Sequence, residues 1–323
     1  MTMEYRRLGR TGLKVSTICL GTMQFGWSTA EPEAHKIISE AVSLGCNFLD
    51  TADVYSNWVD GNPGGVSEKM IGSWIASGAV VRDRVIIATK VRGRMGDGPN
   101  DQGLSRAHIL DSVQNSLRRL QTDYIDLYQV HFPDEDTPLD ETLRALDDLV
   151  RNGMVRYIGC SNYPAWLLAK SLWISDVRGL ARFDSLQPHY SLVHRAEFER
   201  ELQPLCLDQE IGVIPYSPLA GGFLTGKYRR DGDLPRSDRA HGIRERYMND
   251  RGFAAVERLE EIGHAHEATV AQTAIAWVLA NPAVSSAIIG ANSLAQLHDT
   301  IKGGEIALTG EEKAALDAVT AWN

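Results

Sequence analysis

The feature that most constrains the fold of this chain is a regular alternation of short apolar runs and longer amphipathic stretches. Eight short runs are rich in β-branched and other apolar residues: Thr17–Leu20, Cys46–Asp50, Val85–Thr89, Tyr124–Val130, Val155–Cys160, Ser185–Gln187, Gly212–Pro215 and Ser286–Ile289. None of them alternates cleanly between apolar and polar residues, which is typical of parallel strands buried on both faces. The eight runs therefore predict the strands of a parallel sheet.

The longer stretches between these runs have helical spacing, with apolar residues three and four positions apart. They occupy Pro32–Leu44, Ser67–Ile75, Ser105–Leu120, Pro138–Val150, Pro164–Val177, Glu197–Asp208, Val270–Leu279 and Ser293–Ile301. Ser105 is suited to cap the third of these helices, and Gly45 is suited to end the first. Eight strand-then-helix units in series predict an α/β fold, a single (β/α)8 TIM barrel that forms one catalytic domain over residues 1–323.

A doubly wound sheet is the competing architecture. Such a sheet usually has a glycine-rich turn after its first strand, whereas Gly21–Met23 follows the first run here without a GxGxxG motif. Ahead of that run, Tyr5–Leu8 and Lys14–Ser16 predict an N-terminal β-hairpin that could plug the bottom of a barrel. Trp58–Gly65 and Lys227–Arg251 are long βα loops, which a barrel places at its C-terminal face, where binding sites form.

Composition and charge exclude several classes of protein. The chain has 33 Lys and Arg residues against 42 Asp and Glu residues, a formal net charge of −9. Nucleic acids and anionic membranes are bound by concentrated positive charge, so neither partner is expected. No apolar run approaches the roughly 18 residues of a membrane span, and the first residues lack the apolar core of a signal peptide. We therefore expect a cytoplasmic protein.

Neither the cysteines nor the histidines form a metal-binding pattern. The four cysteines lie in or beside apolar segments and are expected to be buried free thiols: Cys19, Cys46, Cys160 and Cys206. His264 and His266 are two positions apart on a predicted helix and would point to different faces. No metal site is expected.

Polar residues follow the C-terminal ends of the predicted strands, which a barrel brings together at one mouth. Asp50 ends the second strand and Tyr55 follows it, while Lys90 ends the third strand. His131 follows the fourth strand. Each has an ordinary alternative: a helix cap, a solvated lysine or a structural histidine. Their joint placement at consecutive strand ends favours a shared site, because charged groups there are costly to bury unless they are paired.

Six segments, in order and at matching spacing, resemble the signatures of the aldo-keto reductase family. They are FLDTADVYS at Phe48–Ser56, IIATKV at Ile86–Val91, IDLYQVHFPD at Ile125–Asp134, IGCSNY at Ile158–Tyr163, IPYSPLAGGFLTGKY at Ile214–Tyr228 and IIGANSLAQL at Ile288–Leu297. The resemblance runs from the N-terminal hairpin to the last strand. It is specific for the family but not for a substrate.

The resemblance implies a catalytic set of Asp50, Tyr55, Lys90 and His131. Tyr55 would be the general acid that protonates the developing alkoxide while hydride reaches the carbonyl carbon. The ordinary pKa of tyrosine is about 10, and we expect the ammonium of Lys90 to lower it, with Asp50 keeping that lysine ionised. His131 would orient and polarise the substrate oxygen.

The resemblance also implies which residues would hold NADP(H). Ser161, Asn162 and Gln187 would contact the nicotinamide carboxamide, and Tyr216 would stack under the nicotinamide ring. Further contacts to the nucleotide are expected from Gly21, Thr22, Asp50, Ser217, Leu219, Gly221, Lys227, Gly290, Asn292, Ser293 and Gln296.

Two positions depart from the family pattern. Many relatives carry Arg or Lys near Asn292 for the 2′-phosphate, and an Asn is frequent where this chain has Thr300. Arg236 or Arg239 in the long loop could supply the missing charge. NADP(H) is the expected cofactor, and NAD(H) is the alternative.

These observations predict an NADP(H)-dependent oxidoreductase that interconverts aldehydes or ketones and alcohols. Two alternatives stay open: a nicotinamide-binding regulatory subunit with little turnover, since some family members serve as channel subunits, and a barrel aldolase with Lys90 as its Schiff base. Apolar side chains beside the mouth could line a substrate pocket or could simply pack there: Trp27, Val54, Trp58 and Phe132. Substrate, reaction direction and oligomeric state are not fixed by the sequence.

Overall fold

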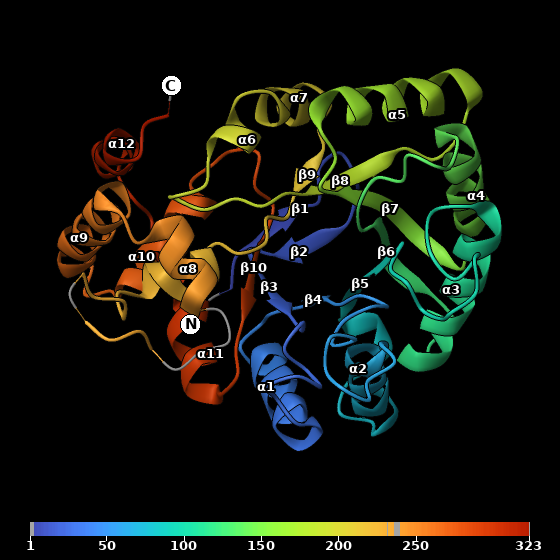
Figure 1. Ribbon diagram of the computed structural model, residues 1–323, viewed down its shortest axis with the longest axis horizontal. Coiled ribbons are helices and arrows are strands. Elements are labelled where there is room, and N and C mark those ends of the chain that lie inside the picture. Colours follow the sequence, from blue (N-terminus) through green and yellow to red (C-terminus); the bar gives the residue numbers. More distant parts are fainter. Residues whose placement is uncertain (1–2, 231, 236–239, 323) are drawn as a thin grey trace.

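The computed structural model of the protein describes residues 3–230, 232–235 and 240–322. Its centre is a parallel sheet in the order β10-β3-β4-β5-β6-β7-β8-β9 (Figure 1). The strands are β3 (Ile18–Gly21), β4 (Phe48–Asp50), β5 (Ile86–Val91), β6 (Ile125–Val130), β7 (Val155–Ser161), β8 (Phe183–Gln187), β9 (Gly212–Val213) and β10 (Ala287–Gly290). Between the two outermost strands, Val213 N donates to Ala283 O at 3.1 Å and Ile288 N donates to Pro215 O at 3.0 Å. These bonds close the sheet, so the predicted (β/α)8 barrel is confirmed.

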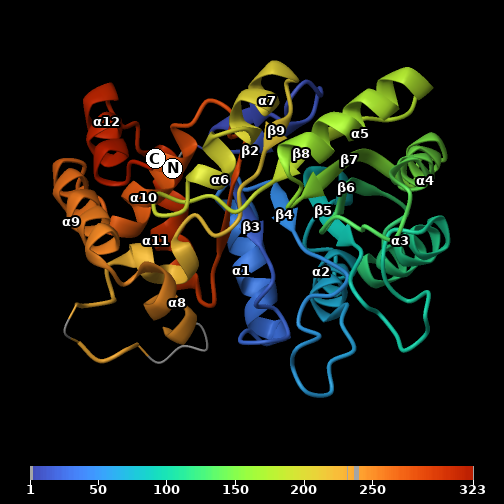
Figure 2. The same cartoon turned by 45° about the horizontal axis from the view of Figure 1, so that its top comes forward.

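Helices surround the outer side of the sheet (Figures 1 and 2). They are α1 (Glu31–Ser43), α2 (Val66–Ala76), α3 (Arg106–Leu120), α4 (Leu139–Arg151), α5 (Ala165–Arg178), α6 (Ala196–Glu199), α7 (Leu202–Asp208), α8 (Ala240–Tyr247), α9 (Asp250–Ala265), α10 (Val270–Leu279), α11 (Leu294–Thr300) and α12 (Gly310–Val319). Three 3₁₀ helices join them: η1 (Arg82–Arg84), η2 (Ala220–Thr225) and η3 (Ile301–Glu305). Ser105 caps α3 by accepting a hydrogen bond from His108 N, and Gly45 ends α1 with φ +92°, both as predicted.

Two helical regions differ from the prediction. The continuous helix expected over Glu197–Asp208 is wrong, because the structure divides it into α6 and α7. Pro204 explains the break, since its ring would clash with the carbonyl of Arg200 in an unbroken helix. The long stretch Lys227–Arg251 is not all loop, because it contains α8, whose Ile243 and Tyr247 are buried.

The N-terminal hairpin closes one end of the barrel. Its strands β1 (Tyr5–Arg7) and β2 (Lys14–Ser16) pair antiparallel. Leu8 and Val15 are fully buried and pack in one cluster with barrel residues such as Phe48 and Leu127. This confirms that the hairpin plugs the barrel, and it leaves the opposite end, where the strands terminate, as the mouth.

A larger apolar layer fills the space between the strands and the helices. The four cysteines are free and buried, as predicted. Burial of the apolar side chains in this layer sets the positions of the strands. It thereby determines which residues lie just beyond the strand ends. Across the described part of the chain, the helices are all too short or too polar to cross a membrane.

Candidate active site

A buried lysine lies at the centre of the barrel mouth. The ammonium of Lys90, which is 0% exposed, donates to Asp50 Oδ1 at 2.6 Å and to Thr51 O at 2.8 Å. It also lies 2.9 Å from the hydroxyl of Tyr55. The paired register of β4 and β5 sets this geometry, because Asp50 lies opposite Ala88 and Lys90 lies two residues further on. Lys90, at the end of one strand, therefore contacts both Asp50 and Tyr55, at and after the end of the neighbouring strand.

Two amides hold the second oxygen of the carboxylate. Asp50 Oδ2 accepts hydrogen bonds from Gln187 Nε2 at 2.9 Å and from Gln129 Nε2 at 3.3 Å. Gln129 is fully buried inside β6 and was not identified from the sequence. The available signal was a single amide within the otherwise apolar end of the run IDLYQV, because a buried amide must find hydrogen-bond partners.

Burial and charge shift the pKa values of this group in a definite pattern. Burial lowers the pKa of Lys90, but Asp50 and Tyr55 more than offset it, so the pKa of the lysine is raised above its usual value. Burial raises the pKa of Tyr55 to about 12, since the lowering effect of the Lys90 ammonium is smaller. The expected net lowering of the Tyr55 pKa is therefore wrong for this structure. Tyr55 keeps its proton at neutral pH and can donate it.

His131 lies beside Tyr55, with ring centroids 5.9 Å apart. Its backbone N–H donates to Val91 O at 3.0 Å, which fixes it next to the end of β5. Burial, together with the charges of Lys90 and Arg92, lowers the pKa of His131 to about 3. The imidazole is therefore neutral at physiological pH, with one nitrogen able to donate a hydrogen bond.

A chain of side-chain hydrogen bonds extends from His131 towards β9. Asn162 Nδ2 donates to His131 O and to Ser161 Oγ, both at 3.0 Å. Ser161 Oγ donates to Gln187 O at 2.7 Å, and Tyr216 Oη donates to Asn162 Oδ1 at 2.9 Å. The candidate nicotinamide contacts thus form one connected group beside the buried lysine.

One face of Tyr216 is covered by another ring. Tyr216 stacks on His189 with a centroid distance of 5.2 Å and an interplanar angle of 11°, and His189 stacks in turn on His194 at 3.9 Å. Tyr216 itself is half-buried. The stack holds the phenol ring flat, as a platform for a second planar group requires.

The segment after Tyr216 has an unusual backbone. Ser217, Ala220, Gly221, Gly222 and Gly226 all have positive φ, between +51° and +106°. A tight succession of such residues makes a concave turn whose backbone can approach a ligand closely. The exposed side chain of Lys227 bends back over this turn, because a Cβ on Gly222 would lie 3.4 Å from Lys227 Nζ. Leu219, at the start of η2, is half-buried.

Residues near the ends of β3 and β10 are divided between the interior and the surface. Gly290, Asn292 and Gln296 are exposed, and Ser293 caps α11 by accepting a hydrogen bond from Gln296 N. Asn292 Oδ1 accepts hydrogen bonds from the hydroxyls of Ser28 and Thr29, both at 3.1 Å.

Gly21 and Thr22, by contrast, are buried. The hydroxyl of Thr22 is bound to Asp50 O and Ser67 Oγ. The Thr22 hydroxyl therefore ties β3 to β4 and α2. Arg236 and Arg239 lie outside the described residues.

Aromatic side chains rise beside the mouth. Trp58 is 47% exposed and makes edge-on contacts with Trp27 and Tyr55, at centroid distances of 5.6 and 6.5 Å. Phe132 is 46% exposed and stacks on His131 at 5.1 Å. Val54 is half-buried. Exposed aromatic rings beside Tyr55 and His131 can form walls for an apolar ligand body.

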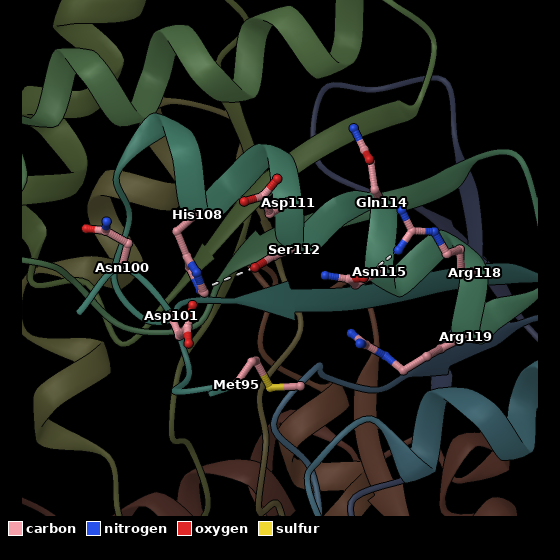
Figure 3. A pocket seen from close by; sticks show the side chains of 10 residues that line it. All are labelled: Met95, Asn100, Asp101, His108, Asp111, Ser112, Gln114, Asn115, Arg118 and Arg119. Atoms are coloured by element: carbon pink, nitrogen blue, oxygen red, sulfur yellow. Dashed lines mark hydrogen bonds between the residues drawn. The ribbon is translucent and has the colours of Figure 1, made fainter. Parts of the chain in front are cut away.

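A second hollow, of about 300 Å³, lies on the outside of the barrel between the loop after β5 and the helix α3 (Figure 3). Polar side chains line most of it, and two pairs of them hydrogen-bond each other: His108 with Ser112, and Arg118 with Asn115. It is set apart from the four residues at the mouth. The mouth, with its buried lysine and perturbed pKa values, is the better candidate for chemistry.

A closed barrel with a buried Lys–Asp–Tyr group at its mouth is the architecture of an oxidoreductase family, and comparison with known proteins identifies it. The chain matches the model of the Aldo/keto reductase family over residues 17–321, and it belongs to this family. Members of the family are oxidoreductases that generally use NAD(P)H.

Three curated relatives span almost the whole chain. The oxidoreductase YrpG of Bacillus subtilis is 43% identical over 314 residues, which cover 96% of this chain and 93% of that protein. A probable voltage-gated potassium channel subunit beta of Arabidopsis thaliana is 36% identical, over 94% of this chain and 92% of that protein. The versiconal hemiacetal acetate reductase of Aspergillus parasiticus is 36% identical, over 96% and 95% respectively.

Proposed function

We propose that the protein is an NADP(H)-dependent oxidoreductase that interconverts aldehydes or ketones and alcohols, with Tyr55 as the general acid. The observation that carries the proposal is the contact of 2.9 Å between Lys90 Nζ and Tyr55 Oη, behind which Asp50 holds the lysine at 2.6 Å. Residues 1–323 would form one catalytic domain, acting in the cytoplasm on a small carbonyl or alcohol substrate.

The bound nicotinamide nucleotide would supply the hydride that reaches the carbonyl carbon. Tyr55 would donate its proton to the carbonyl oxygen as negative charge develops there, and the Lys90 ammonium would stabilise the phenolate left behind. Asp50 keeps Lys90 charged, because a buried ammonium without a partner would lose its proton. His131 would donate a hydrogen bond from its neutral ring to the same oxygen.

The residues at the mouth fit a nicotinamide nucleotide in chemistry and in order. Ser161, Asn162 and Gln187 carry hydroxyl and amide groups, which both donate and accept, and so match the amide group of a carboxamide. The flat face of Tyr216 would support the ring. Asp50 would act at the nicotinamide end of the nucleotide, through its hydrogen bonds with Lys90 and Gln187.

The rest of the nucleotide would follow the barrel rim towards β10. The turn that contains Ser217, Leu219 and Gly221 would hold the pyrophosphate with Lys227. Gly21 and Thr22 would approach the ribose. At the adenosine end, Gly290 would supply backbone, while the polar groups are Asn292, Ser293 and Gln296. These groups carry no charge of their own, so NAD(H) is the alternative that parallel titrations must test.

The test combines nucleotide binding with turnover. Quenching of tryptophan fluorescence by NADPH and NADH measures binding, and absorbance of the reduced nicotinamide follows reduction of an aromatic aldehyde. Tyr55→Phe is expected to bind NADPH as the wild type does and to lose about 100-fold or more in kcat, the range for a lost general acid. Tyr5→Phe is the matched control, since Tyr5 lies in the hairpin, away from the mouth, and its hydroxyl donates to Gly45 O after α1.

Three outcomes would count against the proposal. If neither nucleotide quenches fluorescence, the protein is not a nicotinamide enzyme. Tight NADPH binding without detectable turnover of any carbonyl tested would favour a regulatory subunit, which the channel-subunit relative brings into consideration. Covalent trapping of a carbonyl compound on Lys90 by borohydride would favour an aldolase. The paired, protonated state of Lys90 opposes that last outcome, because Schiff-base formation needs a neutral amine.

A further inference from the structure

An arginine with no role in the proposed chemistry stands at the mouth. Arg92 follows directly after β5, two residues beyond Lys90, and its side chain is exposed. The residue before it, Val91, accepts the backbone hydrogen bond of His131 at 3.0 Å. The residue after it, Gly93, is packed so closely on Val54 that a Cβ there would lie 2.6 Å from Val54 Cβ. Arg92 is therefore bracketed by the segments that carry His131 and Tyr55.

The backbone at Arg92 is strained. Its φ is +126°, whereas the seven other described non-glycine residues with positive φ lie between +51° and +69°, near the left-handed helical region. An L-residue rarely adopts an angle such as +126°, which suits glycine, and strain of this kind persists only when the surrounding structure imposes it. The loop supplies that restraint, because Gly103 N donates to Arg92 O at 3.1 Å and Met95 N donates to Asp101 O at 2.9 Å.

The guanidinium of Arg92 makes no hydrogen bond or ion pair with any part of the chain that the structure describes. The nearby carboxylate of Asp134 is occupied elsewhere, since it accepts hydrogen bonds from Leu104 N at 2.7 Å and from Thr137 Oγ1 at 2.8 Å. The charge of Arg92 nevertheless reaches the site, because it contributes to lowering the pKa of His131. The hydrogen-bond donors of Arg92 are therefore available, and its charge acts on both His131 and Asp134.

The position of Arg92 assigns it to the substrate rather than to the nucleotide. Apart from Gly21, Thr22 and Asp50, the proposed nucleotide contacts follow β7, β8, β9 and β10. In the closed sheet β5 is two strands from β7, four from β9 and three from β10 (Figure 1). The aromatic walls Trp58 and Phe132 follow β4 and β6, the two neighbours of β5. The strand that leads to Arg92 therefore lies between the two strands that lead to the aromatic walls.

We infer that Arg92 selects carbonyl substrates that carry an anionic oxygen group, a carboxylate or a phosphate, at a short distance from the reacting carbonyl. The planar guanidinium can bind either anion through two parallel hydrogen bonds. The aromatic walls would hold the body of the substrate between this anchor and Tyr55. The inference rests on the proposed function, because it names the substrate class of the same site.

The test compares matched substrates in matched variants. 4-Carboxybenzaldehyde differs from its methyl ester by one negative charge, and glyceraldehyde 3-phosphate differs from glyceraldehyde by about 1.5 to 2 negative charges at neutral pH. In Arg92→Gln, the ratio of kcat/KM for the anionic over the neutral member is expected to fall about tenfold or more, equivalent to about 1.4 kcal/mol. Arg84→Gln is the control, since Arg84 is an exposed residue at the opposite end of β5 and should leave both ratios unchanged.

A fall in the kcat/KM ratio for either substrate pair in Arg92→Gln supports the inference and identifies the anion that Arg92 binds. Wild-type ratios for both pairs in Arg92→Gln would overturn it, as would an equal fall in Arg84→Gln. Arg92→Gly separates recognition from folding. Because glycine accepts φ +126°, this variant is expected to melt at a higher temperature than the wild type and still to lose the preference for the anionic substrate.

A binding measurement keeps this inference distinct from the proposed function. If the wild type reduces none of the four compounds, the proposed function fails, and binding of 4-carboxybenzaldehyde and its ester is then measured by quenching of tryptophan fluorescence. Weaker binding of the carboxylate alone in Arg92→Gln would still support anion recognition. Equal binding of both compounds in both proteins would overturn it.

Discussion

Asp53 is a carboxyl group buried without a partner. It is 0% exposed, and neither of its oxygens makes a hydrogen bond within the described chain. Burial, and then the nearby charge of Glu68, raise its pKa well above the usual value, and Arg119 offsets only part of the shift. Glu68 is held separately, by Arg119 at 2.6 Å and by Thr89 at 2.6 Å. Of the two neighbouring carboxyl groups, that of Asp53 is therefore the one that retains a proton.

This carboxyl group predicts a loss of stability as the pH rises. The unfolded chain releases the proton of Asp53 above a pH of about 4, whereas the folded chain holds it up to the raised pKa. The free energy of unfolding should thus fall over that interval, by at most about 1.4 kcal/mol per pH unit. Asp53→Asn is expected to remove this slope. The urea midpoint of the variant should therefore rise relative to that of the wild type between pH 5 and pH 9.

Asp60→Asn is the control for that measurement, because Asp60 is exposed in the loop after β4. Its urea midpoint should follow the wild type at every pH. Parallel curves for Asp53→Asn and the wild type would show that Asp53 is not the buried acid responsible.

Single residues also show where sequence reasoning ends. Asp50, Tyr55 and Lys90 could be placed at strand ends because periodicity locates the strands, and the structure brings them into contact. Gln129 could not be paired with Asp50, nor could the strain at Arg92 be foreseen. The first depends on a contact across 79 positions, and the second on a loop that imposes its backbone angle.

At the scale of elements, α10 has the same bounds as the predicted helix, Val270–Leu279. Its start is set by a capping box, in which Thr269 Oγ1 accepts from Gln272 N and Gln272 Oε1 accepts from Thr269 N. Thr269 also donates to Asp299 Oδ1 at 3.0 Å, in the helix α11. Local signals of this kind are readable in sequence, whereas α6 and α7 were misjudged because the effect of Pro204 was missed.

The capping box predicts a measurable loss. Thr269→Ala should lower the free energy of unfolding by about 1 kcal/mol, because the N–H of Gln272 loses its partner at the start of a buried helix. Thr269→Ser keeps the hydroxyl and should retain most of the wild-type stability. Chemical denaturation checks both variants, and equal losses in alanine and serine would attribute the effect to the methyl group instead.

At the scale of the molecule, the barrel separates stability from chemistry. The hairpin fills one end and the proposed site occupies the other, an arrangement in which the plugged end can be altered without touching the reacting groups. The order of strands and the plug were predictable, since eight β/α units leave few topologies. The hydrogen bonds of the Thr22 hydroxyl were not, because they depend on how β3, β4 and α2 pack.

Leu8 tests this separation. Its side chain is fully buried in the inner cluster, and a Cβ on Gly212 would lie 2.8 Å from Leu8 Cδ1, so truncation leaves a cavity among close neighbours. Leu8→Ala is expected to lower the free energy of unfolding by about 2–5 kcal/mol. Well below its melting temperature, the variant should keep the wild-type kcat/KM, because the mouth is built from the opposite strand ends. Lys14→Ala, an exposed change in the same hairpin, should alter neither quantity. A folded Leu8→Ala protein with strongly reduced turnover would show instead that packing at the plug positions Lys90 and Tyr55 through the length of the strands.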